Sequence, residues 1–442
     1  MSLAPSPSPP ESSAPPVILW DVVEEHFQEA DFLWTQRERS LRAPDQSLAD
    51  VAEGDEYRLV AHLEGLLHAG PRAAERLLLP ALREGLPGEV AVAALCLLAS
   101  EDRDWSGAVL STLPETEQPA ALLAGLALCP GAVEPALREC FPALETPFQA
   151  QVLDVLAFRR ADPGALLEST RTRDEPAVVA AALRAARFTH PDTTLALVGR
   201  GLAHGHPLVR DAALVTGCIF GHREAWLRCR RIVEQTEPFP RQALMALAMG
   251  GEARDLSMLQ ELLSRSDLRD EALWALGFAG RLAAIESLLT WLRAGEPAAA
   301  APLALVSGLS VEKLMVPSGQ QEDAPAEDEP ESGAALPGPV MMKGTVLLQA
   351  IETWWKVAGA RLPTGGRYLC GRPWSLESLL TALEEAPGPW RPGLAWELAV
   401  RTRGSIQVEP RAWSWEQRGV LGTAARHAPR FQAGPFARFM SA

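Results

Sequence analysis

The sequence is poor in residues that favour β-strands. Tyr occurs twice in 442 residues, aromatic residues together make up 6% of the chain, and Val and Ile are far outnumbered by Ala and Leu. Because Ala and Leu have high helix propensity, whereas aromatic and β-branched residues favour strands, this composition predicts an all-α fold. Apolar residues still account for 47% of the chain, which is enough for a sizeable core.

The patterns of metal, cofactor and nucleophile sites are also missing. The six cysteines form no CxxC pair and lie mostly in Ala/Leu-rich segments, which indicates small buried side chains in a reducing compartment. His204, His206, Cys218 and His222 are close in sequence, but their spacing matches no zinc motif, and turn histidines are the better interpretation. There is no GxSxG, no kinase signature set and no phosphate-binding glycine loop. We therefore expect no cofactor, no metal and no catalytic residue.

A basic surplus and a long apolar run are absent as well. The formal net charge is -15 and the sequence pI is about 5.1, whereas a nucleic-acid binder is usually basic. No charge-free run reaches the roughly 18 apolar residues of a membrane span. Residues 1–16 are Ser/Pro-rich and lack the basic and apolar regions of a signal peptide. These features predict a cytoplasmic protein that binds neither nucleic acid nor membrane.

What the chain does contain is a repeat. Arg241–Gly250 and Arg269–Gly280 are each an Ala/Leu-rich helix with a Gly stop, and a second amphipathic helix follows each of them. Aligning all such helices on a leading leucine gives a period near 30, with Pro or Gly between the units. The leucines are Leu63, Leu95, Leu123, Leu153, Leu183, Leu214, Leu244, Leu273 and Leu303. This pattern predicts a HEAT-like α-solenoid, because such short helix pairs must stack on neighbours.

Composition divides the chain into four parts. Residues 1–16 form a disordered tail, and residues 17–316 form the solenoid with an N-terminal cap helix. Residues 317–340 are acidic and proline-rich, which predicts a disordered loop. Residues 341–442 hold seven of the thirteen tryptophans, and we expect a helical region that continues or caps the solenoid.

Arginines and tryptophans are the candidate partner-binding residues. Arginines open the first helix of three successive units, a position that often supports an Arg/Asp ladder in HEAT-like arrays. Some tryptophans lie near Pro and Gly and are compatible with an exposed patch, although packing in the core or cap is the favoured interpretation. The candidates are Arg210, Arg241, Arg269, Trp274, Trp390, Trp413 and Trp415.

Scattered motifs resemble a known family. They are His26, Phe32-Leu33-Trp34, Arg37, Arg42-Ala43-Pro44, Leu48-Ala49-Asp50, His62-Leu63-Glu64-Gly65-Leu66 with Ala69-Gly70, Ala272-Leu273-Trp274-Ala275-Leu276-Gly277, Arg367-Tyr368-Leu369-Cys370-Gly371-Arg372-Pro373 and Trp396-Glu397-Leu398-Ala399-Val400. Together they are similar to a proteobacterial, myxobacterial-type family of HEAT-repeat-like proteins of unknown activity. The chain departs from that pattern at Asp45-Gln46. Members are often encoded near type VI secretion genes, which implies an adaptor, chaperone or immunity role.

The sequence thus favours a solenoid that binds another protein, with a secreted effector or a spike component as the expected partner. Two alternatives remain open. One is an enzyme on the same scaffold, of the lyase or nucleic-acid glycosylase type. The other is a structural scaffold without a single partner.

Overall fold

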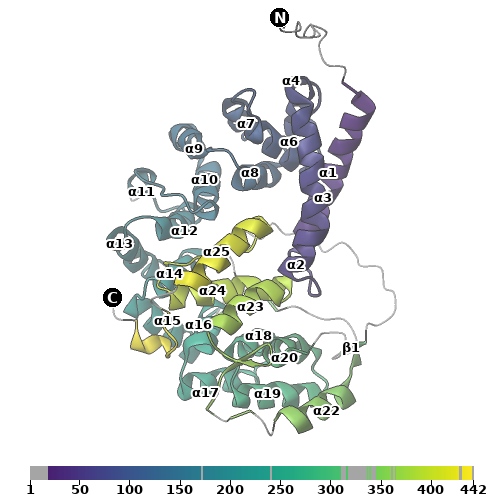
Figure 1. The fold of residues 1–442 in the computed structure, drawn as a ribbon. Coiled ribbons are helices and arrows are strands. Elements are labelled where there is room, and N and C mark those ends of the chain that lie inside the picture. The colour runs from purple at the N-terminus through teal and green to yellow at the C-terminus, as the bar shows by residue number, and fades with distance from the viewer. Residues whose placement is uncertain are drawn as a thin grey trace, which may run out of the picture.

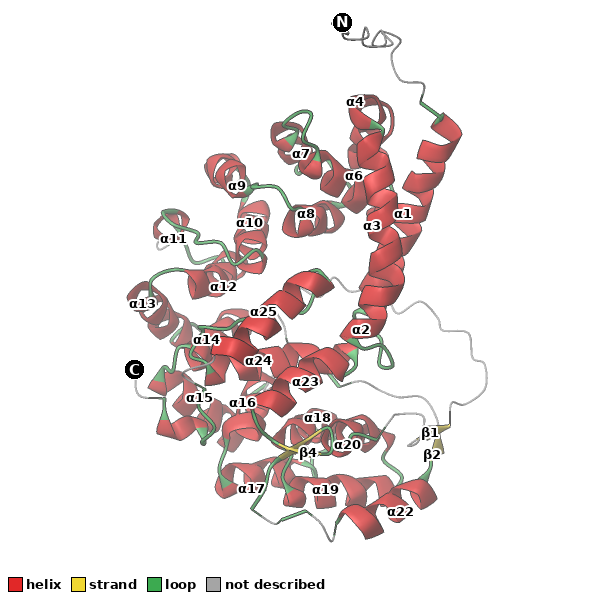
Figure 2. Cartoon of the chain, viewed as in Figure 1, coloured by secondary structure: helices red, strands yellow, loops and turns green. Residues whose placement is uncertain are grey.

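The computed structural model describes residues 18–170, 173–238, 241–309, 315–316, 336, 338–339, 345–359, 362–363, 365–427 and 431–440. Figure 2 shows that these residues are mostly helical, with strands in two short antiparallel pairs. The prediction of an all-α fold is therefore confirmed. The expected tail lies outside the described residues, as does nearly all of the acidic loop.

The architecture is a curved row of helix pairs (Figure 1). One helix of each pair faces the inside of the curve, and each of these inner helices packs on the next, from α6 through α20. We call them the inner row. The inner row is α6 Pro87–Ala99, α8 Pro119–Leu128, α10 Thr146–Phe158, α12 Pro176–Ala185, α14 Pro207–Ile219, α16 Arg241–Gly250, α18 Arg269–Ala279 and α20 Ala300–Ser307.

The second helix of each pair lies on the outside of the curve. Several of these outer helices also contact one another along the row, including α13 with α15, α15 with α17 and α17 with α19. The outer helices are α7 Ser106–Thr112, α9 Glu134–Cys140, α11 Leu166–Ser169, α13 Pro191–Leu202, α15 Arg223–Glu234, α17 Ala253–Leu262 and α19 Leu282–Arg293. Short 3-10 turns follow α9 and α12 and precede α20: η3 Phe141–Ala143, η4 Ala186–Phe188 and η5 Pro297–Ala299.

Two sequence features explain the inner row. Each of the helices α6, α8, α10, α12 and α14 has proline at one of its first two positions, where the missing N–H costs no hydrogen bond and the fixed φ suits a helix. The nine leading leucines of the repeat lie in α3 and in the eight inner helices, and all nine are buried. The period near 30 therefore marks one core position of successive repeats.

The chain begins with two long helices that cover the first end of the row. They are α1 Trp20–Ser40 and α3 Tyr57–His68, and α1 packs on both α3 and α6. The short helix α2 Leu48–Val51 and the π-helical turn η1 Ala52–Glu56 connect them. Helix α4 Gly70–Ala73, the π-helical turn η2 Ala74–Leu78 and helix α5 Leu79–Glu84 lead into α6.

After α20 the chain leaves the row and then returns along its inside. Strands β1 Met315–Val316 and β2 Thr345–Val346 pair, and α22 Leu348–Ala358 follows. Residues 367–440, which we call the return segment, then run back between the arms of the curve (Figure 1). The return segment consists of β3 Tyr368–Leu369, β4 Arg372–Pro373, α23 Leu376–Glu385, η6 Gly388–Trp390, α24 Arg391–Arg401, α25 Ser414–His427 and η7 Phe436–Arg438.

This course differs from the expected continuation or cap of the solenoid. The return segment contacts both ends of the row: β3 packs on α20, α24 packs on α14, and α23 and α25 both reach α2. Much of the inner face of the row is therefore covered by the protein's own chain. The physical reason is the apolar inner face itself, which would otherwise expose the side chains on which α24 packs.

The buried apolar residues form two clusters that meet near the middle of the row. One cluster extends from Val23 to Ala213, and the other extends from Leu214 to Met440. Trp413 is the residue of the return segment that belongs to the first cluster. Within the described residues, none of the helices combines the length and the apolarity that a bilayer crossing needs.

Candidate functional site

A buried ion-pair network fixes the return segment to the N-terminal helices. The Arg37 side chain is completely buried, and its Nε donates to Glu56 Oε1 at 2.9 Å. Its Nη2 donates to the carbonyls of Arg411 and Ala412, and its guanidinium lies 4.7 Å from the centre of the Trp413 ring. Glu56 also accepts the Ser414 N–H, at 2.9 Å. These contacts hold the start of α25 against α1 and η1.

A second buried network fixes the other end of the return segment. Glu397 of α24 is fully buried and binds the guanidinium groups of Arg367 and Arg401, with Arg401 Nε at 2.7 Å. Both arginines also donate to carbonyls of the inner row, Arg367 to Phe278 and Arg401 to Met249. Burial raises the pKa of Glu397, but the two cations outweigh it and the net pKa is lowered.

Close backbone contacts also hold the return segment in place. Gly280 ends α18 with a left-handed φ of 61°, and its carbonyl accepts the Tyr368 N–H at 2.7 Å. A Cβ at Gly280 would stand 2.1 Å from the Tyr368 carbonyl oxygen, so this crossing requires glycine. Gly388 likewise donates to the carbonyls of Ala43 and Gln46. The return segment is therefore hydrogen-bonded both to the row and to the connection between α1 and α2.

The three candidate arginines link repeats to one another. The Arg241 guanidinium binds Glu271 at 2.8 Å, and Arg269 lies 3.8 Å from Glu296. Arg210 binds Asp211, its neighbour in sequence, at 2.9 Å and lies 3.7 Å from Glu237. The expected Arg/Asp ladder is thus built mainly with glutamate. These side chains are engaged within the row, and their assignment as partner contacts stays a prediction.

The candidate tryptophans are mostly core residues. Trp274, Trp390 and Trp413 are 1%, 4% and 4% exposed, and Trp274 stacks on Trp390 with ring centres 3.9 Å apart. Their assignment as partner contacts is corrected, because each fills space between the row and the return segment. Trp415 is different: it is 51% exposed and stacks on Trp413 at 4.6 Å. It remains a candidate contact.

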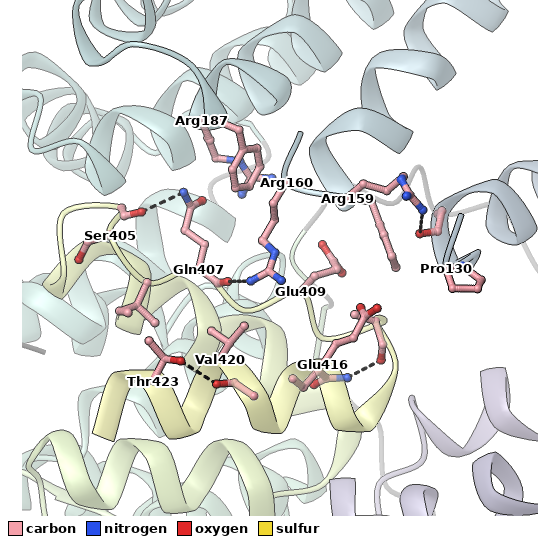
Figure 3. A pocket seen from close by; sticks show the side chains of 18 of the residues that line it. Pro130, Arg159, Arg160, Arg187, Ser405, Gln407, Glu409, Glu416, Val420 and Thr423 are labelled. Atoms are coloured by element: carbon pink, nitrogen blue, oxygen red, sulfur yellow. Dashed lines mark hydrogen bonds between the residues drawn. The ribbon is translucent and has the colours of Figure 1, made fainter. Parts of the chain in front are cut away.

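A pocket lies between the inner row and the return segment. Its volume is about 750 Å³, within the range of small-molecule sites. In Figure 3, Arg160 and Arg187 lie on the row side of the pocket, opposite Gln407 and Glu409 of the return segment, whereas Arg159 extends toward Pro130. The lining residues are Ala127, Cys129, Pro130, Phe158, Arg159, Arg160, Arg187, Phe188, Gly404, Ser405, Ile406, Gln407, Glu409, Ala412, Glu416, Gln417, Gly419, Val420 and Thr423.

The pocket wall on the row side is built from three successive repeats. The ends of α8, α10 and α12 with η4 contribute to it, and Phe158 and Phe188 come from neighbouring repeats, 30 residues apart. Arg159 is a structural residue of this wall. Its Nε binds Glu134 at 2.7 Å, and its Nη atoms donate to the carbonyls of Cys129 and Gly131. Within the described part of the chain, Arg160 and Arg187 do not make such a set of contacts with the wall: each donates one hydrogen bond, to the Gln407 and the Arg184 carbonyl respectively.

The opposite wall carries the acidic groups. Glu409 accepts the Arg411 backbone N–H at 3.3 Å. Burial raises the pKa of Glu409, and Arg411, Arg187 and Arg160 oppose that rise. Burial lowers the pKa of Arg187, while the Glu409 carboxylate opposes that change. Oppositely charged groups therefore act on each other across the pocket.

Sequence reasoning did not identify this pocket. A signal was present for the row side, since Arg159-Arg160 and Arg187 follow the first helices of two successive repeats. No comparable signal marks Glu409, which lies in an irregular stretch between α24 and α25. Its position opposite Arg187 depends on the path of the return segment.

The cysteines and histidines singled out in the sequence have local packing roles. All six cysteines are free, and burial raises the pKa of the Cys96 thiol to about 12. Cys218 is buried in α14, and His204 and His206 accept backbone N–H bonds in the turn before that helix. Among the described residues, no group of His, Cys, Asp and Glu side chains is arranged to hold a metal ion.

Comparison with known proteins leaves the family open. No family model matches the chain, and no curated protein matches it. Among solved structures, an engineered protein matches over 86% of this chain and 98% of its own length, with 15% identity and a TM-score of 0.28. Likeness at that level carries no argument about function.

Proposed function

We propose that the protein binds another protein, as a HEAT-like adaptor, chaperone or immunity protein linked to a type VI secretion effector or spike. The family resemblance of the sequence motifs supports the secretion link. Stacked helix pairs offer long surfaces for protein contacts, which supports the binding role.

The observation that carries the proposal is the exposed, rigidly held Trp415. Exposed tryptophans that are fixed by their neighbours are typical interface anchors, because little side-chain entropy is lost on binding. Stacking on buried Trp413 fixes the Trp415 ring. Tyr57 is 74% exposed and follows Glu56, the residue that binds Ser414. Exposed aromatic residues thus occur on α25 and on α3, close to the contact between Ser414 and Glu56.

Purification of the tagged chain from its native host tests the proposal. We expect a near-stoichiometric partner with the wild type, encoded beside this gene, and loss of that partner with Trp415→Ala. The matched control is Phe32→Ala, another exposed aromatic residue, on α1. Absence of any near-stoichiometric partner, or equal recovery with Trp415→Ala, contradicts the proposal.

A second candidate function is catalysis on the same scaffold, of the lyase or nucleic-acid glycosylase type. The observation that favours it is Glu409, whose pKa is raised by burial and which lines a pocket beside arginines. For the glycosylase type, we would expect the protein to release modified bases from alkylated DNA and Glu409→Gln to abolish that release. No release by the wild type would exclude this type.

A further inference from the structure

Two arginines in the pocket retain most of their hydrogen-bonding capacity. In the part of the chain that the structure describes, Arg160 makes one hydrogen bond, from Nη1 to the Gln407 carbonyl at 3.4 Å. Arg187 makes one as well, from Nε to the Arg184 carbonyl at 3.0 Å. A guanidinium has five N–H donors, so several donors of each residue are available to a bound group.

The nearby carboxylate does not satisfy these guanidinium groups. Across the described ranges, Glu409 forms no ion pair with Arg160 or Arg187, although the charges of both lower its pKa. The Oε1 atom of Gln407 is also buried and has no hydrogen-bond partner among the described residues. The free N–H donors of Arg160 and Arg187 and the Gln407 Oε1 acceptor therefore belong to one pocket but form no hydrogen bonds with each other.

Apolar side chains form a further part of the lining and come from both walls. Phe158 and Phe188 contribute rings from the row side, and Ile406 and Val420 contribute aliphatic side chains from the return segment. The ends of α8, α10 and α12 bring partial negative charge, which the arginines offset. Arg159 is paired with Glu134, so the cations that remain in the pocket are Arg160 and Arg187 on the row side. The two carboxylates, Glu409 and Glu416, lie on the opposite wall.

We propose that this pocket binds a small anionic molecule with a flat apolar body, an aromatic carboxylate or an aromatic phosphate ester. Arg160 and Arg187 bind the anionic group, and the apolar body lies among Phe158, Phe188, Ile406 and Val420. Glu409 competes with the ligand for the two guanidinium groups. This inference goes beyond the proposed partner, because it concerns the pocket between the row and the return segment and not the exposed Trp415.

Arg160 allows a clean test, because it occupies a left-handed backbone conformation with φ at 54°. Glycine adopts that conformation without strain, so Arg160→Gly removes the guanidinium and leaves the fold intact. Thr236→Gly is the matched control, since Thr236 has φ at 50° and does not line the pocket. Arg187→Gln is the second variant, with melting temperature as the check on folding.

The experiment is calorimetric titration of the full chain with 1-naphthoate, 1-naphthyl phosphate and neutral 1-naphthol. We expect at least one of the two anions to bind and the naphthol to bind more weakly; the stronger anion identifies the carboxylate or phosphate class. Arg160→Gly is expected to weaken anion binding about tenfold, the loss of a charge-assisted contact. Thr236→Gly leaves binding unchanged, and Glu409→Gln tightens it by removing the competing carboxylate.

Three results would overturn the proposal. The first is that neither anion binds. The second is that naphthol binds as tightly as the anions. The third is that Arg160→Gly, folded as the wild type, binds the anions with unchanged affinity. None of these results depends on Trp415, so failure here is distinct from failure of the partner proposal.

Discussion

The row of helix pairs and the return segment are stabilised in different ways. The row repeats one apolar position, from Leu63 to Leu303, and each inner helix packs on the next. The return segment packs its tryptophans into the row but is held by hydrogen bonds from two buried ion-pair networks. Arg37, paired with Glu56, donates to carbonyls of the return segment. Arg367 and Arg401, paired with Glu397, donate to carbonyls of the row. Apolar stacking is tolerant of substitution, whereas a buried ion pair fails when one partner is removed.

The largest expected effect is therefore in the return segment. Glu397→Gln leaves Arg367 and Arg401 buried beside each other without a counter-charge, which should cost about 3–5 kcal/mol of unfolding free energy. Guanidinium chloride unfolding measures it. The control is Glu352→Gln, which removes an exposed pair with Arg293 and should leave the unfolding midpoint unchanged. Equal midpoints for the two variants would show that the Glu397 network is not stabilising.

Acid should act through the same carboxyl group. The folded-state pKa of Glu397 lies below its ordinary value, so the stabilisation is complete above that value. It is lost as the pH falls through the lowered folded-state pKa. The wild type should therefore lose stability in acid more steeply than Glu397→Gln. Parallel pH profiles of melting temperature would contradict the lowered pKa.

A truncation in the row should cost somewhat less. Leu153→Ala removes a fully buried side chain of α10, with an expected loss of about 2–5 kcal/mol. Urea unfolding measures it, with the exposed Leu348→Ala as the control. If the two leucine variants unfold at the same urea concentration, the repeating leucines do not form the core of the row.

Trp413→Phe should weaken the contact between the return segment and the row, with a smaller loss of stability. The indole Nε1 donates to the Leu128 carbonyl at 2.8 Å, and losing this bond should cost about 1 kcal/mol. Hydrogen exchange of α25 should accelerate while exchange of α10 stays unchanged. The exposed Trp415→Phe is the control. Faster exchange throughout the row would show that the two regions are not separable.

The smallest expected effect is at the N-terminal end. His62 packs against His26, with their Nδ1 atoms 3.0 Å apart, and burial followed by the His26 charge lowers the pKa of His62. Glu29 and Glu25 oppose this shift, and Arg58 adds to it. Stability should be complete above about pH 6.5 and should fall slightly below it. His62→Asn should remove this slope, and exposed His68→Asn should keep it.

The sequence predicted the row because its core position recurs with a measurable period. It also predicted a helical C-terminal region, in which α23 and α24 lie. It did not predict the return itself. That path depends on single residues such as Arg37 and Gly388, whose partners lie hundreds of positions away. The pocket was missed for the same reason, since Glu409 faces the arginines only after the chain has returned.

Hydrogen exchange at individual amides tests the placement of the return segment most directly. The N–H groups of Gly388 and Ser414 donate to Gln46 and Glu56, partners from the other end of the chain. If the return segment lies against the N-terminal helices, these two amides should be protected like those in the middle of α10. Exchange of both at the rate of exposed chain, with α10 still protected, would contradict the account.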